Sequence, residues 1–113
     1  MSYDVHLRCP ECGANHEQNN LNYTYNVAPM LREAFGCEDP DGNICGIKVI
    51  HGMVGIEASE VVHKALVKMA ADPGKYRAMN PPNGWGDYWG CMTFLREIYE
   101  DCLGNPDKRV EVC

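Results

Sequence analysis

The sequence lacks the features that mark several large classes of protein. No apolar run approaches the roughly 20 residues that a membrane-spanning helix needs. The opening residues MSYDVH have neither the basic flank nor the apolar stretch of a signal peptide. Lys and Arg together number 10 against 16 Asp and Glu, and they form no cluster that could bind a phosphate backbone. We therefore expect a cytoplasmic protein that binds neither a membrane nor a nucleic-acid polymer.

Catalytic signatures are also missing from the sequence. It contains no HExxH, P-loop, GxSxG or GxGxxG motif. Cys37 or Cys45 could form a nucleophilic pair with His51, but no residue of the sequence is placed to orient such a pair. The sequence therefore favours a binding protein over an enzyme.

The composition is that of one ordinary globular domain. Of the 113 residues, 45% are hydrophobic and 23% are charged, which suits a single core. Apolar and polar residues alternate near both ends of the chain, at Tyr3, Val5 and Leu7 and again at Val110 and Val112. This period of two predicts a strand at each end, and the two strands are expected to pair. The short apolar run at residues 47–50 predicts a third strand.

Three longer segments have the period of a helix. They cover about residues 27–35, 58–69 and 88–103, with Asn26 and Asp87 as predicted N-caps and Gly36 as a predicted stop. Residues 75–79 predict one further turn of helix. The whole pattern predicts an α+β fold in which about three helices cover one face of a small antiparallel sheet. The other face is left open, which makes a homodimer through sheet or helix contacts an expectation.

The most specific local motif is CPECG at residues 9–13. A Cys-x-x-Cys turn that contains Pro and Gly aims two thiolates at one tetrahedral ion and leaves backbone N–H groups free to bond the sulfurs. Further ligands must come from elsewhere in the chain. The preferred candidates are two cysteines that flank a polar loop, and His16 and His51 are the alternatives. The sequence predicts one structural zinc, held by Cys9, Cys12, Cys37 and Cys45.

Two alternatives to zinc stay open at this motif. Cys9 and Cys12 could be free thiols at the end of a strand, or they could form a redox pair. A redox pair needs a thioredoxin-like unit in which the motif opens a helix, and residues 14–19 show little helical amphipathicity. Because no export signal accompanies the seven cysteines, we expect reduced thiols and no disulfide framework.

Two segments rich in asparagine lead into predicted helices. NYTYN at residues 22–26 precedes the first helix, and NPPNGWGDYWG at residues 80–90 precedes the third. Helix N-termini attract anions, aromatic faces stack on a base or a sugar, and Asn side chains both donate and accept hydrogen bonds. The second segment also holds both tryptophans of the chain. We predict one ligand site, formed by Asn22, Thr24, Asn26, Asn83, Trp85, Asp87 and Tyr88.

A purely structural interpretation of these segments also stays open. Asn and Asp cap helices, Gly and Pro form turns, and Trp85 or Trp89 could cover the core. The carboxylate of Asp87 would occupy the N-terminus of the third helix, which disfavours a phosphate there. An amide, a ribose or a base suits that position better.

The same segments resemble those of small proteins encoded by bacteriophages and their bacterial hosts. The likeness consists of the N-x-T-x-N pattern at residues 22–26, the following Pro29-Met30, and NPPNGWG at residues 80–86. The MSYDV opening and residues 52–55 fit it as well, whereas residues 9–16 and 37–45 lie outside it. The resemblance implies a non-enzymatic binding protein in a bacterial cytoplasm, and it carries over no catalytic residue. Its implied ligand is a nucleotide-like defence signal that is sequestered and not transformed.

Two other functions compete with this one. The first is a protein–protein interaction module that inhibits a host protein through an aromatic anchor, made of Trp85, Tyr88 and Trp89. The second is a small nucleotide hydrolase, for which the sequence offers no convincing base.

Overall fold

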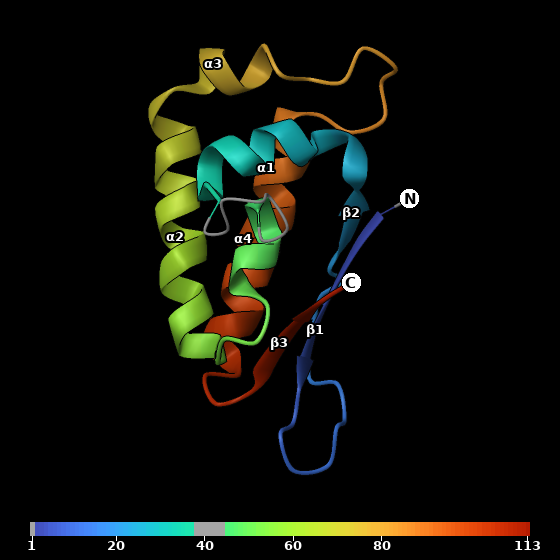
Figure 1. Ribbon diagram of the computed structural model, residues 1–113, viewed down its shortest axis with the longest axis vertical. Helices are drawn as coiled ribbons and strands as arrows, with labels where there is room; N and C mark the ends of the chain where they lie inside the picture. The colour runs from blue at the N-terminus through green and yellow to red at the C-terminus, as the bar shows by residue number, and fades with distance from the viewer. Residues whose placement is uncertain (1, 38–44) are drawn as a thin grey trace.

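The computed structural model describes residues 2–37 and 45–113, and it shows a three-stranded sheet with helices along one side (Figure 1). In chain order the elements are β1 (Ser2–Arg8), β2 (Asn22–Thr24), the 3-10 helix η1 (Tyr25–Val27), α1 (Ala28–Phe35), the 3-10 helix η2 (Gly46–Ile50), α2 (Gly55–Ala71), α3 (Pro73–Arg77), α4 (Tyr88–Gly104) and β3 (Arg109–Val112). Among these described residues, no helix is long and apolar enough to cross a membrane.

The sheet confirms the predicted pairing of the terminal strands. Its order is β2-β1-β3, and β1 runs antiparallel to both neighbours. Val5 lies opposite Val112, while Tyr3 lies opposite Tyr23. Tyr23 belongs to β2, a strand of three residues within a segment that we expected to be a loop. A strand this short is difficult to recognise from its sequence, because it shows barely one period of alternation.

The two faces of the sheet differ sharply in polarity. On β1 the odd positions Tyr3, Val5 and Leu7 are buried, whereas the even positions are only partly buried. Even-numbered side chains form bonds over the outer face: Arg8 forms an ion pair with Glu111 at 2.8 Å, and the His6 ring forms a hydrogen bond with the Glu17 carboxylate at 2.8 Å. The helices cover the inner face, where α4 contacts β1 and β2 and η2 contacts β3. The α+β architecture with one covered face is therefore confirmed.

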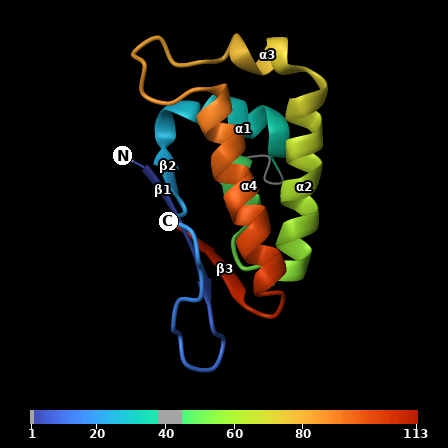
Figure 2. The same cartoon turned by 180° about the vertical axis from the view of Figure 1, so that it is seen from behind.

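Helices α2 and α4 lie side by side and run in opposite directions (Figures 1 and 2). Both were predicted, and their apolar stripes form much of the core, with Val62, Ala65 and Met69 from α2 and Leu95 and Ile98 from α4. Asp87 is the N-cap of α4, as predicted, and its carboxylate accepts a hydrogen bond from the Gly90 amide at 2.6 Å. The predicted extra turn after α2 is present as α3.

Two local predictions were wrong. Asn26 does not cap α1, because Thr24 caps the preceding η1 and its hydroxyl accepts from the Asn26 amide at 3.3 Å. Residues 47–50 form part of η2 and not a strand. In η2 the side chains of Ile47, Val49 and Ile50 are all buried, which the strict alternation of a strand does not permit on a single inner face.

Candidate ligand hollow and candidate metal cluster

Most of the predicted ligand-contacting residues line a single surface hollow of about 540 Å³. One wall comes from β1, β2 and η1, and the other comes from the loop that joins α3 to α4, near the N-terminal end of β1 (Figure 1). Residues that are some 60 positions apart in the sequence thus face one space. The lining residues are Ser2, Asn22, Thr24, Asn26, Asn83 and Trp85.

Tyr23 fastens the two walls of the hollow to each other. Its hydroxyl accepts a hydrogen bond from the Asp87 amide at 3.0 Å and lies 3.4 Å from the Asp87 carbonyl, to which it can donate. The Tyr23 ring stacks on Phe94 of α4 with 5.6 Å between the ring centroids. Burial raises the pKa of Tyr23, so the phenol keeps the proton that it donates. Sequence reasoning missed this role, although Tyr23 stands in the segment that it singled out.

Two glycines allow the loop to approach β2 this closely. A Cβ atom added to Gly86, whose φ is +94°, would lie 2.6 Å from the Thr24 methyl carbon. A Cβ atom on Gly90 would lie 1.9 Å from the Tyr23 hydroxyl oxygen. Both distances are well below van der Waals contact, so any side chain at either position would push the walls apart. The close approach of the two walls at these two positions therefore depends on glycine.

Asp87 and Tyr88 do not line the hollow. Asp87 is occupied as the N-cap of α4 and as the partner of Tyr23. Tyr88 is 2% exposed, and its hydroxyl donates to the Met69 carbonyl at 3.0 Å. Its amide donates to the Asn80 side chain at 2.8 Å. Tyr88 is therefore a core residue, and it cannot serve either as a ligand contact or as part of a surface anchor.

Both tryptophans lie on the surface, so the interpretation that they cover the core is wrong. Trp85 is 68% exposed at the rim of the hollow, and Trp89 is 63% exposed on the first turn of α4. An exposed indole does not contribute the hydrophobic free energy that its burial would contribute. The two indoles lie on different parts of the surface, because Trp85 lines the hollow and Trp89 does not.

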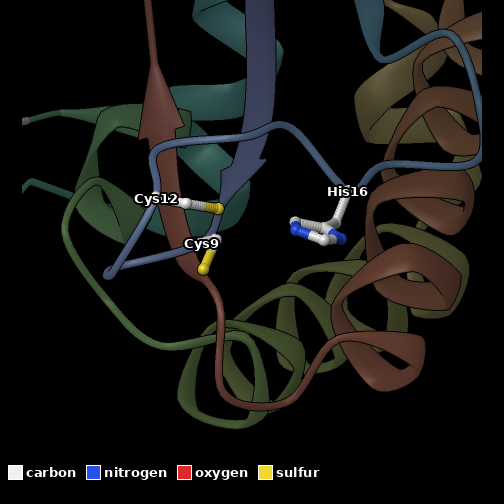
Figure 3. Close-up of side chains that lie close together, drawn as sticks. All are labelled: Cys9, Cys12 and His16. Carbon is white, nitrogen blue, oxygen red and sulfur yellow. The ribbon is translucent and has the colours of Figure 1, made fainter.

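The metal-binding motif lies at the opposite end of the molecule, in the loop that extends beyond the sheet between β1 and β2 (Figure 1). There Cys9, Cys12 and His16 place one ligand atom each within 4.8 Å of one another. Figure 3 shows the Cys12 sulfur and the His16 ring pointing toward each other across a gap that the Cys9 sulfur also borders. Two thiols and an imidazole at this separation can hold a metal ion.

The turn at residues 9–14 favours the thiolate form of Cys9. Hydrogen bonds from the backbone at Cys12 and Glu11, and then the Cys12 side chain, lower the pKa of the Cys9 thiol. The turn is closed by the Gly13 amide, which donates to the Cys9 carbonyl at 2.9 Å, while Gly13 has φ +75°. Metals bind thiolate and not thiol, so this turn lowers the proton competition at one ligand.

His16 is held in place by its backbone. Its amide donates to the Leu7 carbonyl at 2.7 Å, and its carbonyl accepts from the Asn105 side chain at 3.3 Å. Its ring nitrogen Nε2 is buried and has no hydrogen-bond partner among the described residues. A buried, unpaired ring nitrogen costs free energy unless something binds it.

The predicted contribution of Cys37 and Cys45 to the metal site was wrong. These two residues form a disulfide with each other, so neither offers a thiolate. The Cys37–Cys45 pair joins the end of α1 to the start of η2, where Gly46 donates to the Gly36 carbonyl at 3.0 Å. The expectation of reduced thiols fails for this pair, and the polar loop between them lies outside the described residues. His16, the reserve ligand, takes a place in the cluster instead.

The remaining cysteines fall into two classes. Cys91 and Cys102 are fully buried in α4, and burial raises the pKa of each thiol to about 12. Both act as small apolar core residues, as their places on the predicted inner face of the helix indicated. Cys113 is exposed, and partial desolvation and then the nearby Glu111 carboxylate raise the pKa of its thiol.

A third surface feature follows the outer side of α2 and α4. Most of the exposed large apolar side chains of the described residues lie there, including Ile56, Val67, Trp89 and Leu103. Ile56 and Leu103 line one shallow groove between the helices, of about 330 Å³, and Trp89 lines another, of about 360 Å³. An apolar patch of this kind is common where a protein contacts another protein.

Comparisons with known proteins add no family to these observations. The chain matches no protein-family model, no curated protein and no solved structure. The functional interpretation of the hollow and of the metal cluster therefore depends on their residues and geometry.

Proposed function

We propose that this protein is a non-enzymatic binding protein whose hollow holds a nucleotide-like ligand. The observation that carries the proposal is the exposed Trp85 indole at the rim of a hollow lined with carboxamide and hydroxyl groups. An indole face stacks on a base, and amide groups match the donors and acceptors on the edge of a base or on a ribose. Among the described residues that line the hollow, none is a usual nucleophile or general base apart from hydroxyls that lack an activating partner.

The biological role that we propose is sequestration of a defence signal in a bacterial cytoplasm. It rests on the resemblance to small bacteriophage-encoded proteins at residues 22–26 and 80–86, the two segments that form the walls of the hollow. A protein that binds such a signal without transforming it lowers the free concentration of the signal in proportion to the number of copies made. Tight binding and slow release serve this role better than turnover does.

Thermal-shift screening with cyclic and ADP-ribose-type nucleotides tests this function. A ligand that binds only the native state raises the melting temperature, by an amount equivalent to about 2.7 kcal/mol at 100 times Kd. Chromatography of the recovered ligand then distinguishes sequestration from catalysis, because a protein that only binds the ligand releases it intact, whereas a hydrolase releases an altered molecule. The variant Trp85→Ala should abolish the shift in melting temperature. The control variant Trp89→Ala removes a similarly exposed tryptophan that lies outside the hollow, and it should retain the shift.

A second candidate function is favoured by the outer face of α2 and α4. There Trp89 stands beside Leu66 and Met92 on one of the two grooves. An exposed tryptophan next to an apolar groove has the composition of an interface hot spot. As a protein–protein module the chain would offer this face to a host protein or to a second copy of itself. The anchor then consists of Trp89 and its groove, with Trp85 more distant and Tyr88 in the core.

One experiment distinguishes this module from the binding protein. Light scattering at increasing protein concentration reports the mass of the particle, and Trp89→Glu introduces a charge beside the groove that Leu66 and Met92 also line. If that face joins two copies, the wild-type mass approaches twice 12.7 kDa and the variant stays at one chain. If the wild type is monomeric and Trp89→Glu binds a nucleotide with the wild-type affinity, the hollow alone accounts for function.

We also propose that Cys9, Cys12 and His16 bind one structural zinc ion. Zinc prefers tetrahedral sites of thiolate and imidazole, with bonds of about 2.3 Å to sulfur and about 2.0 Å to nitrogen. Such bonds place ligand atoms about 3.5–4 Å apart, so a group already within 4.8 Å needs only a small contraction. The described residues supply three ligands, and water or an external group completes the coordination. The ion would stabilise a loop that is otherwise held mainly by backbone hydrogen bonds.

A further inference from the structure

The hollow differs from an ordinary nucleotide site in its charge. None of its described lining residues carries a charge. The nearby acidic side chains are Asp4, which accepts from Asn22 at 2.8 Å, and Asp87, which follows the wall residue Trp85 by two positions and caps α4. Phosphate groups are usually bound by Arg, Lys, a metal ion or a cluster of backbone N–H groups. Two nearby carboxylates instead repel a phosphate.

The hydrogen-bonding capacity that remains in the hollow is mixed. Both N–H groups of the Asn22 amide are used, on Ser2 at 3.1 Å and on Asp4 at 2.8 Å, which leaves its oxygen as an acceptor. Asn83 is the opposite case, because its oxygen accepts from the Trp85 amide at 3.0 Å and its NH₂ group has no partner among the described residues. Thr24 accepts twice from Asn26 and keeps its hydroxyl proton to donate.

This arrangement matches a ligand that both donates and accepts. A phosphate only accepts, so it would leave the Asn22 oxygen facing an anion at a further energetic cost. The edge of a base carries amide-like donors and acceptors, and a ribose carries hydroxyls that do both. The Trp85 indole, which is 68% exposed on the rim, offers a ring face on which an uncharged ring can stack.

We infer that the hollow binds the uncharged nucleoside part of its ligand, and that the phosphates contribute nothing to affinity. This inference rests on the proposed function, since it names the part of a nucleotide-like molecule that the residues recognise. Any phosphate points out of the hollow into solvent. The protein would then bind a nucleoside and its phosphorylated forms alike, and it would discriminate by base and sugar.

Calorimetry with adenosine, guanosine and their 5′-monophosphates at low and high salt tests the inference, with free ribose as the sugar-only probe. We expect the preferred nucleoside and its monophosphate to agree in Kd within about threefold, and both to be insensitive to salt, because no ion pair forms. The two tryptophans provide an internal reference in a ¹H–¹⁵N spectrum. The Trp85 indole signal should shift on titration, and the Trp89 signal should not.

The outcomes separate this inference from the function on which it rests. Binding of a nucleotide with a nucleoside more than tenfold weaker, or with affinity that falls steeply with salt, overturns the inference and leaves the proposed function intact. Binding of ribose as tight as that of any nucleoside also overturns it, because the base is then not recognised. If neither nucleosides nor nucleotides bind, both ideas fail.

The substitution Asn83→Asp probes the unpaired NH₂ group directly. An aspartate keeps the oxygen that accepts from the Trp85 amide, removes the donor that has no partner and adds a negative charge, which the control Asn20→Asp also adds. We expect about a tenfold weaker binding of the nucleoside and of its monophosphate alike. The matched control is Asn20→Asp, at an exposed position whose side chain lies outside the hollow and makes no hydrogen bond within the described ranges. An Asn83→Asp variant that weakens only the monophosphate, or neither ligand, contradicts the inference.

Discussion

The two ends of this molecule are built in different ways. At the end near α3 the hollow has fixed walls: Tyr23 bonds Asp87 across them, and glycines at 86 and 90 let the walls meet. At the other end the loop with Cys9, Cys12 and His16 extends away from the helices and places its ligand atoms in a loose group (Figures 1 and 3). In our proposal the walls of the first site are formed before any ligand arrives, whereas a bound ion would complete the second.

This difference predicts how each end responds to change. A preformed site loses affinity when its supporting contacts are removed, because the ordering that they supply must then be paid for by the ligand. A site that the metal completes loses local stability when the metal is removed, because metal-binding free energy is also folding free energy. We expect a change at either end to affect the other end little, although β1, β2 and α4 extend between them. Asp87 caps α4 beside Tyr23, and Asn105 at the other end of α4 donates to the His16 carbonyl at 3.3 Å.

The largest effect is expected from removing the metal. If zinc binds, protein purified without chelators and without a histidine tag contains about one zinc per chain. A chelator then lowers stability by about 4 kcal/mol relative to protein in free zinc at ~1,000 times Kd. Elemental analysis and thermal melting measure the two quantities.

Two variants control the metal experiment. Cys12→Ser should lose the zinc and the chelator effect together. Cys113→Ser alters an exposed cysteine outside the cluster and should retain both. Zinc-free wild-type protein with an unaltered melting temperature in chelator would rule out the metal.

The next largest effect is expected from Gly90→Ala. Its Cβ atom would lie 1.9 Å from the Tyr23 hydroxyl oxygen, so the ring must move away and release the loop from β2. Overpacking of this kind costs about 1–3 kcal/mol, as measured by denaturant unfolding. Ligand affinity at the hollow should fall as well, while zinc content stays the same. Gly104→Ala is the control, because a Cβ atom there meets nothing within 4 Å.

Tyr23→Phe should have a smaller effect at the same place. It keeps the ring that stacks on Phe94 and removes only the hydroxyl that bonds Asp87. Loss of one partly exposed hydrogen bond costs about 1 kcal/mol in unfolding free energy. Affinity for the ligand should fall by a comparable factor if wall spacing controls binding, and an unchanged affinity would show that the walls need no fastening.

The smallest effect concerns cysteine reactivity in metal-free protein. Because the reactive species is the thiolate, a lowered pKa moves alkylation to lower pH and a raised pKa moves it to higher pH. Cys9, whose pKa is lowered by backbone hydrogen bonds, should therefore react with iodoacetamide at lower pH than Cys113, whose pKa is raised. Cys91 and Cys102, buried and with pKa values of about 12, should resist in the folded state. Mass spectrometry of digests taken across a pH series measures all four, and equal pH profiles for Cys9 and Cys113 would contradict the assignment.

Sequence alone predicted the long elements and the terminal pairing, because these depend on periodic burial that each segment shows by itself. It failed at Ile47–Ile50 and at Asn22–Thr24, which are too short to complete a period. It also predicted that residues 22–26 and residue 85 would come together at one site, since both segments had the same chemistry. Tyr88 was assigned to that site wrongly, because its neighbours gave no sign that its hydroxyl reaches the Met69 carbonyl.

The metal ligands illustrate a different limit. The Cys-x-x-Cys turn is local and was recognised, but its remaining partner depended on how the chain returns in space. Cys37 and Cys45 are closed upon each other across a sequence separation of 8, a pairing that spacing alone does not distinguish from joint coordination. His16 was available only four residues beyond Cys12, and its buried unpaired nitrogen is visible only in the structure.

The central position of β1 has a consequence for how the domain forms. Its partner on one side, β3, is separated from it by about a hundred residues, as the Arg8–Glu111 bond across 103 positions shows. The entropy of closing so long a loop must be spent before the strand gains its second neighbour. Domains dominated by such distant contacts fold slowly and acquire their order late. During synthesis, β1 therefore cannot pair with β3 until residues 109–112 have been made. A chain that lacks these residues would expose one edge of β1 to pairing with any other strand nearby.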